Sequence, residues 1–306
     1  MNAPRSPLRN RLFLAFWGAT LVSNIGTWIH KVAEQWLMTR LSPSPLMVAL
    51  VTAAATLPPL LLSLPAGALA DVVDRRRLLI AMQLWMAVAA GVLGGLTIAG
   101  LVTPWLLLTF TALLSVGDAL NGPAWAALVP DIVSREELAV AISLNAVNFN
   151  LARAIGPTVG GVLIAATGTG TAFLVNGASF LGVIVVLLLW RSPVKDGKLP
   201  PEHLASAIRS GLRYVRHEPV LAWLLVRTVA FMWCASALWA LLPVLATRTL
   251  GLGATGYGVL VGCLGTGAVL GAFGSAWLAR RVSIDVVADA ATVAFGTAML
   301  GIGLAH

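Results

Sequence analysis

Long apolar stretches without charge recur along this chain and alternate with short polar segments. Residues 78–117 and residues 154–190 contain no charged side chain. Since about 20 apolar residues are enough to cross a bilayer as a helix, each stretch is long enough for two crossings. Each also has helix-breaking residues near its middle, Thr103-Pro104 in one and residues 167–171 in the other. Both stretches therefore predict a pair of helices joined by a tight turn.

The same reading applied to the whole chain predicts an all-α, polytopic transmembrane helix bundle. The ten-residue alternation typical of membrane β-barrels is not visible. Composition agrees, because 58% of residues are hydrophobic and 10% are charged, against roughly 25% charged in soluble domains. The expected spans cover residues 12–38, 46–70, 78–100, 104–128, 138–165, 171–190, 219–246, 255–279 and 285–305.

The net charge of +8 could suggest nucleic-acid binding, but the placement of the charges favours a membrane topology signal. With nine spans, most Lys and Arg residues fall on one side of the bilayer, together with the amino terminus. Positive residues are retained in the cytoplasm. The sequence therefore predicts a cytoplasmic N-terminus, a lipid bilayer as partner and no nucleic acid.

One long polar segment, residues 191–218, divides the chain. It separates a predicted six-helix half, residues 1–190, from an incomplete half with three spans, residues 219–306. Within the linker, residues 205–217 show the pattern of an amphipathic helix lying on the cytoplasmic surface.

Residues 67–77, GALADVVDRRR, place five charges directly after a charge-free span. Such a cluster is expected at the bilayer surface, where carboxylates and guanidiniums can clasp a neighbouring helix end. The pattern resembles the loop between the second and third spans of the major facilitator superfamily, Gly-x-Leu-Ala-Asp-x-x-x-Arg-Arg-x, although Asp74 replaces that family's usual glycine. The matching positions considered as a conformational switch are Gly67, Asp71, Arg75 and Arg76.

The resemblance covers the whole chain and extends to the branch that contains bacterial enterobactin exporters. Residues 21–28, 42–48, 64–67 and 121–124 carry this closer likeness. It implies two helical halves rocking about a central site, and proton-driven export of a small amphipathic molecule, either a drug or a siderophore. The expected setting is a monomer in the inner membrane of a bacterium.

Family members have twelve spans, so the resemblance also implies that this chain is truncated after its ninth. In the family the aspartate corresponding to Asp71 caps a neighbouring helix, commonly the eleventh. A degraded gene product, a fragment that transports nothing, and import instead of export remain open alternatives.

Ionisable residues inside spans are costly and are candidates for function. Asp118 and Arg153 fall at nearly equal depth in two consecutive antiparallel spans, which predicts that they pair. Asn121 and Asn148 are expected beside them. Asp118 is then either a protonatable or substrate-contacting group in a central cavity, or one partner of a static ion pair.

Two further candidates lie in the first and fifth spans. Glu34 shares a helix face with His30 and Lys31 near the outer interface, which indicates either a local polar cluster or an outward gate. Gly156-Pro157 resembles the glycine-proline motif of exporters in the superfamily. Pro157 can kink the helix, while the glycines around it suit close helix packing.

No catalytic or cofactor motif accompanies these residues. The chain lacks a phosphate-binding loop, a metal-ligand spacing and a serine-centred elbow. The sequence therefore predicts no enzyme activity and no cofactor, and it leaves an ion gradient as the energy source; the resemblance implies a transporter driven by protons.

Overall fold

A computed structural model describes residues 7–190, 213, 216–278 and 281–304, and nine of the helices there are long and apolar enough to cross a membrane. The nine predicted spans are thus confirmed, and the first six helices are somewhat longer than predicted. Two short helical segments accompany them, η1 (Pro7–Arg9) and the π-helical η2 (Leu245–Thr249). The long helices are α1 (Arg11–Leu41), α2 (Pro45–Val72), α3 (Arg75–Ile98), α4 (Pro104–Ile132), α5 (Leu138–Thr167), α6 (Thr169–Leu189), α8 (Pro219–Val244), α9 (Ala254–Leu278) and α10 (Ile284–Leu304).

The helix ends follow from local sequence. Asn10 caps α1, because its side-chain oxygen accepts hydrogen bonds from the backbone N–H groups of Leu12 and Phe13 at 3.0 and 3.4 Å. Thr103 caps α4 in the same way, directly before Pro104. Gly168, with φ of +88°, makes the turn between α5 and α6. Both predicted breaks between paired helices are therefore confirmed.

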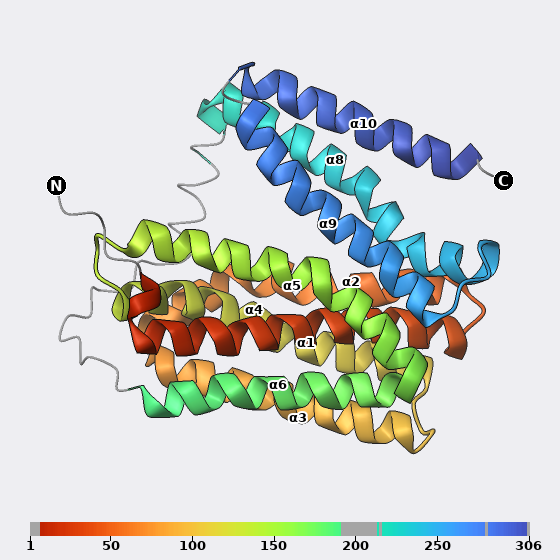
Figure 1. The fold of residues 1–306 in the computed structure, drawn as a ribbon, viewed down its shortest axis with the longest axis horizontal. Helices are drawn as coiled ribbons and strands as arrows, with labels where there is room; N and C mark the ends of the chain where they lie inside the picture. Colours follow the sequence, from red (N-terminus) through yellow and green to blue (C-terminus); the bar gives the residue numbers. More distant parts are fainter. Residues whose placement is uncertain (1–6, 191–212, 214–215, 279–280, 305–306) are drawn as a thin grey trace.

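Helices α1 to α6 form one bundle, and α8 to α10 form a second group (Figure 1). In the first bundle α1 packs against α5 and α6, and α3 packs against α4 and α6, whereas α2 lies mainly on α4. The second group joins the first chiefly through α9 on α5 and α8 on α2. The two groups meet near the C-terminal end of α1 and diverge towards the end where α1 begins (Figure 1).

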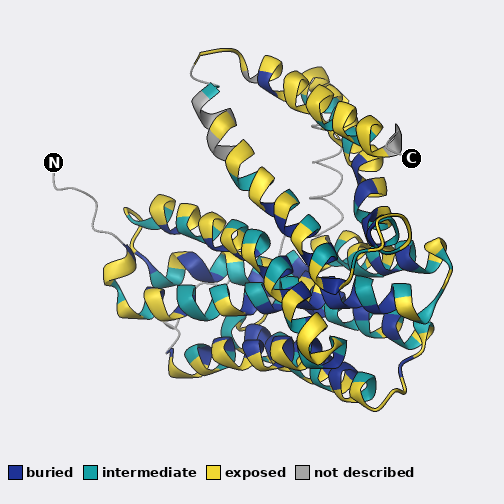
Figure 2. Cartoon of the chain, turned by 45° about the vertical axis from the view of Figure 1, so that its right-hand side comes forward, coloured by how far each residue is buried: buried dark blue, intermediate teal, exposed yellow. Residues whose placement is uncertain are grey.

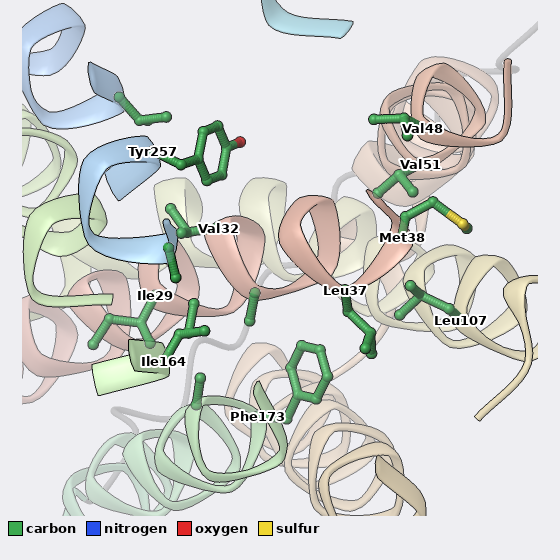
Figure 3. Close-up of a cluster of buried hydrophobic side chains, with 14 of the residues drawn as sticks. Ile29, Val32, Leu37, Met38, Val48, Val51, Leu107, Ile164, Phe173 and Tyr257 are labelled. Atoms are coloured by element: carbon green, nitrogen blue, oxygen red, sulfur yellow. The ribbon is translucent and has the colours of Figure 1, made fainter. Parts of the chain in front are cut away.

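The largest buried apolar cluster lies where the two groups meet (Figure 3). It joins Ile29 and Val32 of α1 to Ile164 of α5, Phe173 of α6 and Tyr257 of α9. Towards the outside, large apolar side chains are left uncovered, such as Leu60 at 74% and Val220 at 80% exposure. Exposed residues predominate on α10 (Figure 2). An apolar outer surface of this extent suits lipid and not water.

The charged motif after α2 binds the ends of two neighbouring helices. Nη1 of Arg75 donates to the carbonyl of Ala127 at 3.2 Å and to Asp131 at 3.3 Å, near the end of α4. Arg76 donates to the carbonyls of Leu187 and Leu188 at 2.7 and 2.8 Å, at the end of α6. Cations at helix C-termini are favourable. The clasp expected from the sequence is therefore confirmed for the two arginines.

Other parts of the motif behave differently. Asp74, the departure from the family pattern, caps α3 by accepting a hydrogen bond from the backbone N–H of Arg77 at 2.8 Å. A side chain added at Gly67 would meet nothing within 4 Å, so packing does not explain this glycine. The side chain of Asp71, residues 191–212 of the predicted linker, and most of the amphipathic helix expected at 205–217 lie outside what the structure describes.

Candidate functional site

A cavity of about 290 Å³ lies inside the bundle formed by α1 to α6. All of its lining residues belong to these six helices, and most of them are polar. From α1 and α2 come Thr20, Ser23, Asn24, Thr27, His30, Lys31, Glu34 and Ala55; from α3 and α4, Gln83, Met86, Thr111, Leu114, Ser115, Asp118, Asn121 and Trp125; and from α5 and α6, Asn145, Asn148, Phe149, Asn176, Phe180 and Val183. Of the five polar residues that the sequence suggested for proton coupling or substrate contact, four line this one space, namely Glu34, Asp118, Asn121 and Asn148, and Arg153 does not.

Glu34 is held in a buried polar cluster. Only 4% of its surface is exposed, and its Oε1 accepts a hydrogen bond from the Thr111 hydroxyl at 2.7 Å. Nε2 of His30 lies 3.1 Å from the same oxygen, and the His30 ring packs on Phe173 at 4.5 Å between centroids. The predicted local cluster is confirmed for His30 and Glu34. Packing against α4 and α6 leaves both residues 4% exposed, and their depth in the bilayer stays a prediction.

Asn148 fixes α5 against α1. Its amide nitrogen donates to the carbonyl of Trp17 at 2.7 Å, and its oxygen accepts from the amide of Asn24 at 2.9 Å. With 2% exposure, Asn148 is almost fully enclosed. Its hydrogen bonds therefore serve helix packing as well as the cavity wall.

Asp118 faces the cavity from α4, one turn before Asn121. The oxygen of Asn121 accepts a hydrogen bond from Nε2 of Gln83 at 3.1 Å. Within the part of the chain that the structure describes, Asp118 has no hydrogen bond or ion pair, and it is exposed to the cavity. The carboxylate is therefore available to a ligand.

The predicted pair of Asp118 and Arg153 is wrong. The guanidinium of Arg153 lies over the ring of Trp28 at 5.9 Å and over the ring of Trp239 at 5.6 Å, and Arg153 does not line the cavity. The reason lies in the packing, since α4 contacts α2 and α3 whereas α5 contacts α1 and α9. Equal depth in consecutive helices did not make them neighbours.

The glycine-proline motif packs on two sides, with Gly156 against α1 of its own group and Pro157 against α9 of the second group. A Cβ at Gly156 would stand 2.5 Å from Cβ of Trp28, and a Cβ at Gly258 would stand 2.5 Å from the carbonyl oxygen of Pro157. Gly161 also has no room for a side chain, because the carbonyl oxygen of Ala254 would lie 2.7 Å away. Helix α5 continues through Pro157. These contacts favour the packing role that the sequence left open beside a hinge.

Comparison with known proteins agrees with this architecture. Residues 2–306 match the family of major facilitators described as transmembrane secretion effectors (MFS_3). The chain belongs to this transporter family. The expected membership of the major facilitator superfamily is thereby confirmed.

Individual relatives include two bacterial transporters. The multidrug efflux pump Tap of Mycolicibacterium fortuitum is 30% identical over 97% of this chain and 73% of its own length. The enterobactin exporter EntS of Salmonella typhi is 28% identical over 78% of this chain and 56% of its own length. This member of the family is therefore similar both to a drug pump and to a siderophore exporter.

A solved structure shows the same fold. It is a bacterial homologue of the human lysosomal transporter Spinster, in an inward-facing and unoccupied conformation. The likeness has a TM-score of 0.72 at 18% sequence identity and covers 90% of this chain. The chain spans 64% of that protein's length, just under two thirds.

Sequence reasoning missed several residues of the site. Gln83 and Thr111 were overlooked, although Gln83 is the only amide in the apolar stretch 78–117 and could have been found from that isolation. The contact of Trp239 with Arg153 was also missed. That contact depends on how α8 approaches α5, which no local pattern records.

Proposed function

We propose that this protein is a secondary active transporter that exports a small amphipathic molecule, a drug or a siderophore, by alternating access driven by protons. The cavity inside α1 to α6 carries the proposal, because it combines polar side chains with two carboxylates in the interior of a membrane bundle. Ionisable groups in such a place are costly and mark substrate or proton pathways. The similarity to Tap and EntS supports this class of cargo.

Protons would act at the two carboxylates. Glu34 is buried with Thr111 and His30, and Asp118 is open to the cavity. Protonation of either group removes a charge from the cavity and so changes the free energy of binding a charged cargo. The same residues thus serve both coupling and substrate contact in this proposal.

Alternating access is supported by the arrangement of the two helix groups. They are in contact through α9 on α5 and α8 on α2, and they diverge towards the N-terminal end of α1 (Figure 1). With the amino terminus in the cytoplasm of a bacterium and the protein in the plasma membrane, as proposed from the charge distribution, this conformation faces inward. Gly67, Asp71, Arg75, Arg76, Gly156 and Pro157 are proposed to control the change between conformations.

Transport in proteoliposomes with an imposed pH gradient tests the function. Asp118→Asn is expected to abolish proton-driven uptake of a fluorescent drug into inverted vesicles while the protein is still inserted normally. Full transport by this variant would refute the role of Asp118. The alternative, a fragment that transports nothing, predicts no protonophore-sensitive flux even for the unaltered chain.

A further inference from the structure

From the cavity geometry we infer that the corner formed by Gln83, Asp118 and Asn121 is a binding site for a protonated amine. The inference rests on the proposed transport function and narrows its cargo to cationic amphipathic molecules. The exposed carboxylate of Asp118 and the buried side chain of Gln83 both line the cavity. Nothing in the described structure neutralises Asp118 there.

The first step of the argument is the supply of acceptor atoms. Gln83 is 4% exposed, and its Nε2 donates to Asn121 at 3.1 Å, while its Oε1 is buried without a hydrogen-bond partner. Buried polar atoms are rarely left unpaired in folded proteins, so this oxygen calls for a donor. The carboxylate of Asp118 can only accept when ionised. A ligand that fits this corner must therefore donate hydrogen bonds.

The second step is the position of Gln83 beside Asp118. Asp118 and Asn121 are three residues apart on α4 and so lie on one helix face. Helix α3 packs closely on α4 at this level, since a Cβ on Gly117 would stand 2.6 Å from Cγ of Met86. Gln83, hydrogen-bonded to Asn121, therefore belongs to the same corner as Asp118, and the proposed ammonium group would contact Asp118 directly and Gln83 after its buried amide turns towards it.

The third step is the charge of the whole cavity. Its other carboxylate, Glu34, already accepts hydrogen bonds from Thr111 and His30. Thr111, which holds Glu34, precedes Asp118 by seven residues, which separates these two positions by about 10 Å along α4 at 1.5 Å per residue. The one lysine of the lining, Lys31, places its ammonium over the ring of Trp28 at 5.1 Å. Lys31 is exposed and keeps its positive charge, so what distinguishes Asp118 is that it is the lining carboxylate with no partner among the described residues.

The fourth step is the apolar surface around the corner. Met86, Trp125 and Phe180 line the same cavity from three different helices. The ring of Trp125 is held edge-on by Phe16 at 5.7 Å between centroids. An aromatic wall beside a carboxylate suits a cation with an apolar body, because aromatic faces attract cations. An anionic siderophore would instead meet an unpaired carboxylate.

Binding of three matched dansyl probes to the purified full chain in detergent tests this inference. The probes share one fluorophore and one linker and end in a primary ammonium (dansylcadaverine), a neutral N-acetyl amide, or a carboxylate. We expect the ammonium probe to bind about tenfold more tightly than either of the others, as a charge-assisted contact in a desolvated site would give. Equal affinities, a preference for the carboxylate probe, or no saturable binding of the ammonium probe would overturn the inference.

Variants locate the preference at this corner. Asp118→Asn should remove it, and Gln83→Leu should weaken binding of the ammonium probe alone. Gln83→Glu, which adds a second carboxylate at similar volume, should strengthen that binding. Asp285→Asn serves as the matched control, since Asp285 is an exposed aspartate on α10 outside the cavity. An unchanged preference in both Asp118→Asn and Gln83→Leu would overturn the assignment.

The proposed function fails separately from this site. If the protein binds the ammonium probe with the expected preference but transports no drug in proteoliposomes, the amine site stands and the transport proposal is refuted. If the protein transports but binds the three probes with equal affinity, the transport proposal stands and the amine site is refuted.

Discussion

The guanidinium of Arg153 lies 5.6 Å from the ring centre of Trp239 and so joins the two helix groups of this transporter. Arg153 belongs to α5 and Trp239 to α8, and the guanidinium also lies over the ring of Trp28 of α1 at 5.9 Å. The contact is sheltered, because Nε of Arg153 is buried without a hydrogen-bond partner. A cation between two aromatic rings takes the place of the ion pair that the sequence predicted.

The first prediction concerns this contact. Replacing Arg153 by Met and Trp239 by Leu, singly and together, should reveal a coupling of about 1 kcal/mol between the two side chains, the size of a partly desolvated cation–π contact. The measurement is a double-mutant cycle on unfolding in detergent. Arg227→Met with Trp239→Leu is the control cycle, because Arg227 pairs with Asp289 of α10 at 2.6 Å. A coupling near zero for Arg153 and Trp239 would contradict the prediction.

The second prediction concerns the hydrogen bond between Thr111 and Glu34. Thr111→Val should destabilise the protein by about 2 kcal/mol, because it removes a donor from a buried carboxylate. Thr111→Ser keeps the hydroxyl and should cost clearly less. In the Glu34→Gln background the cost of Thr111→Val should shrink. Equal losses in both backgrounds, measured by thermal unfolding in detergent, would show that the contact is energetically unimportant.

The third prediction concerns coupling to protons at the same carboxylate. Glu34→Gln removes the ionisable group at nearly constant volume, so drug transport should lose its dependence on an imposed pH gradient while binding of the drug remains. Glu136→Gln is the control, since Glu136 is exposed and lies outside the cavity. Flux in proteoliposomes with and without a protonophore makes the comparison. Gradient-dependent flux at the normal rate in Glu34→Gln would exclude this residue from coupling.

The fourth prediction concerns the contact between α5 and α9. Gly258→Val should destabilise the protein by roughly 1–3 kcal/mol and push the two helices apart, because even a Cβ at Gly258 would lie 2.5 Å from the carbonyl oxygen of Pro157. Gly267→Val is the matched control on the same helix, with nothing within 4 Å of an added Cβ. Unfolding in detergent and spin-label distances between α5 and α9 report the two effects. Equal behaviour of the two variants would contradict the close packing.

The fifth prediction concerns the arginine clasp. Arg76→Ala should destabilise the protein by about 1 kcal/mol, since Arg76 binds two carbonyls at the end of α6 and is partly exposed. Arg77→Ala, which removes the neighbouring exposed arginine, is the control and should have little effect. Thermal unfolding at low and high salt tests both. The loss in Arg76→Ala should decrease at high salt, because exposed charge interactions are screened.

The sequence was sufficient for the parts of this fold that depend on local chemistry. Charge-free stretches predicted the nine spans, and the breaks at Thr103-Pro104 and Gly168 are where the chain turns. The arginines after α2 were expected to clasp a helix end, and they bind the ends of α4 and α6. Hydrophobicity, helix breakers and charge at the surface are each readable over a few residues.

Residue partners across the bundle could not be read in the same way. Depth along a helix follows from counting residues, and that count placed Asp118 and Asn121 at the level of a central cavity, which both of them line. Which side chains can meet depends on which helices pack against one another. The sequence pattern did not show that α1 lies against α5 while α4 lies against α2 and α3. The predicted partner of Asp118 was wrong for this reason.

Confinement of the cavity to α1–α6 has a consequence for how work would be done in transport. A molecule bound there would contact residues of α1–α6 alone, and it would keep these contacts when α8–α10 move relative to them. The affinity for this molecule would then not depend on the movement of α8–α10, except through the access of water to the cavity. The switch would have to draw its bias from the seam around Arg153, Trp239 and the facing glycines, and from the protons at the two acids. Substrate binding and conformational change would then share only the two acids, while the residues where the helix groups meet could vary without altering the cavity.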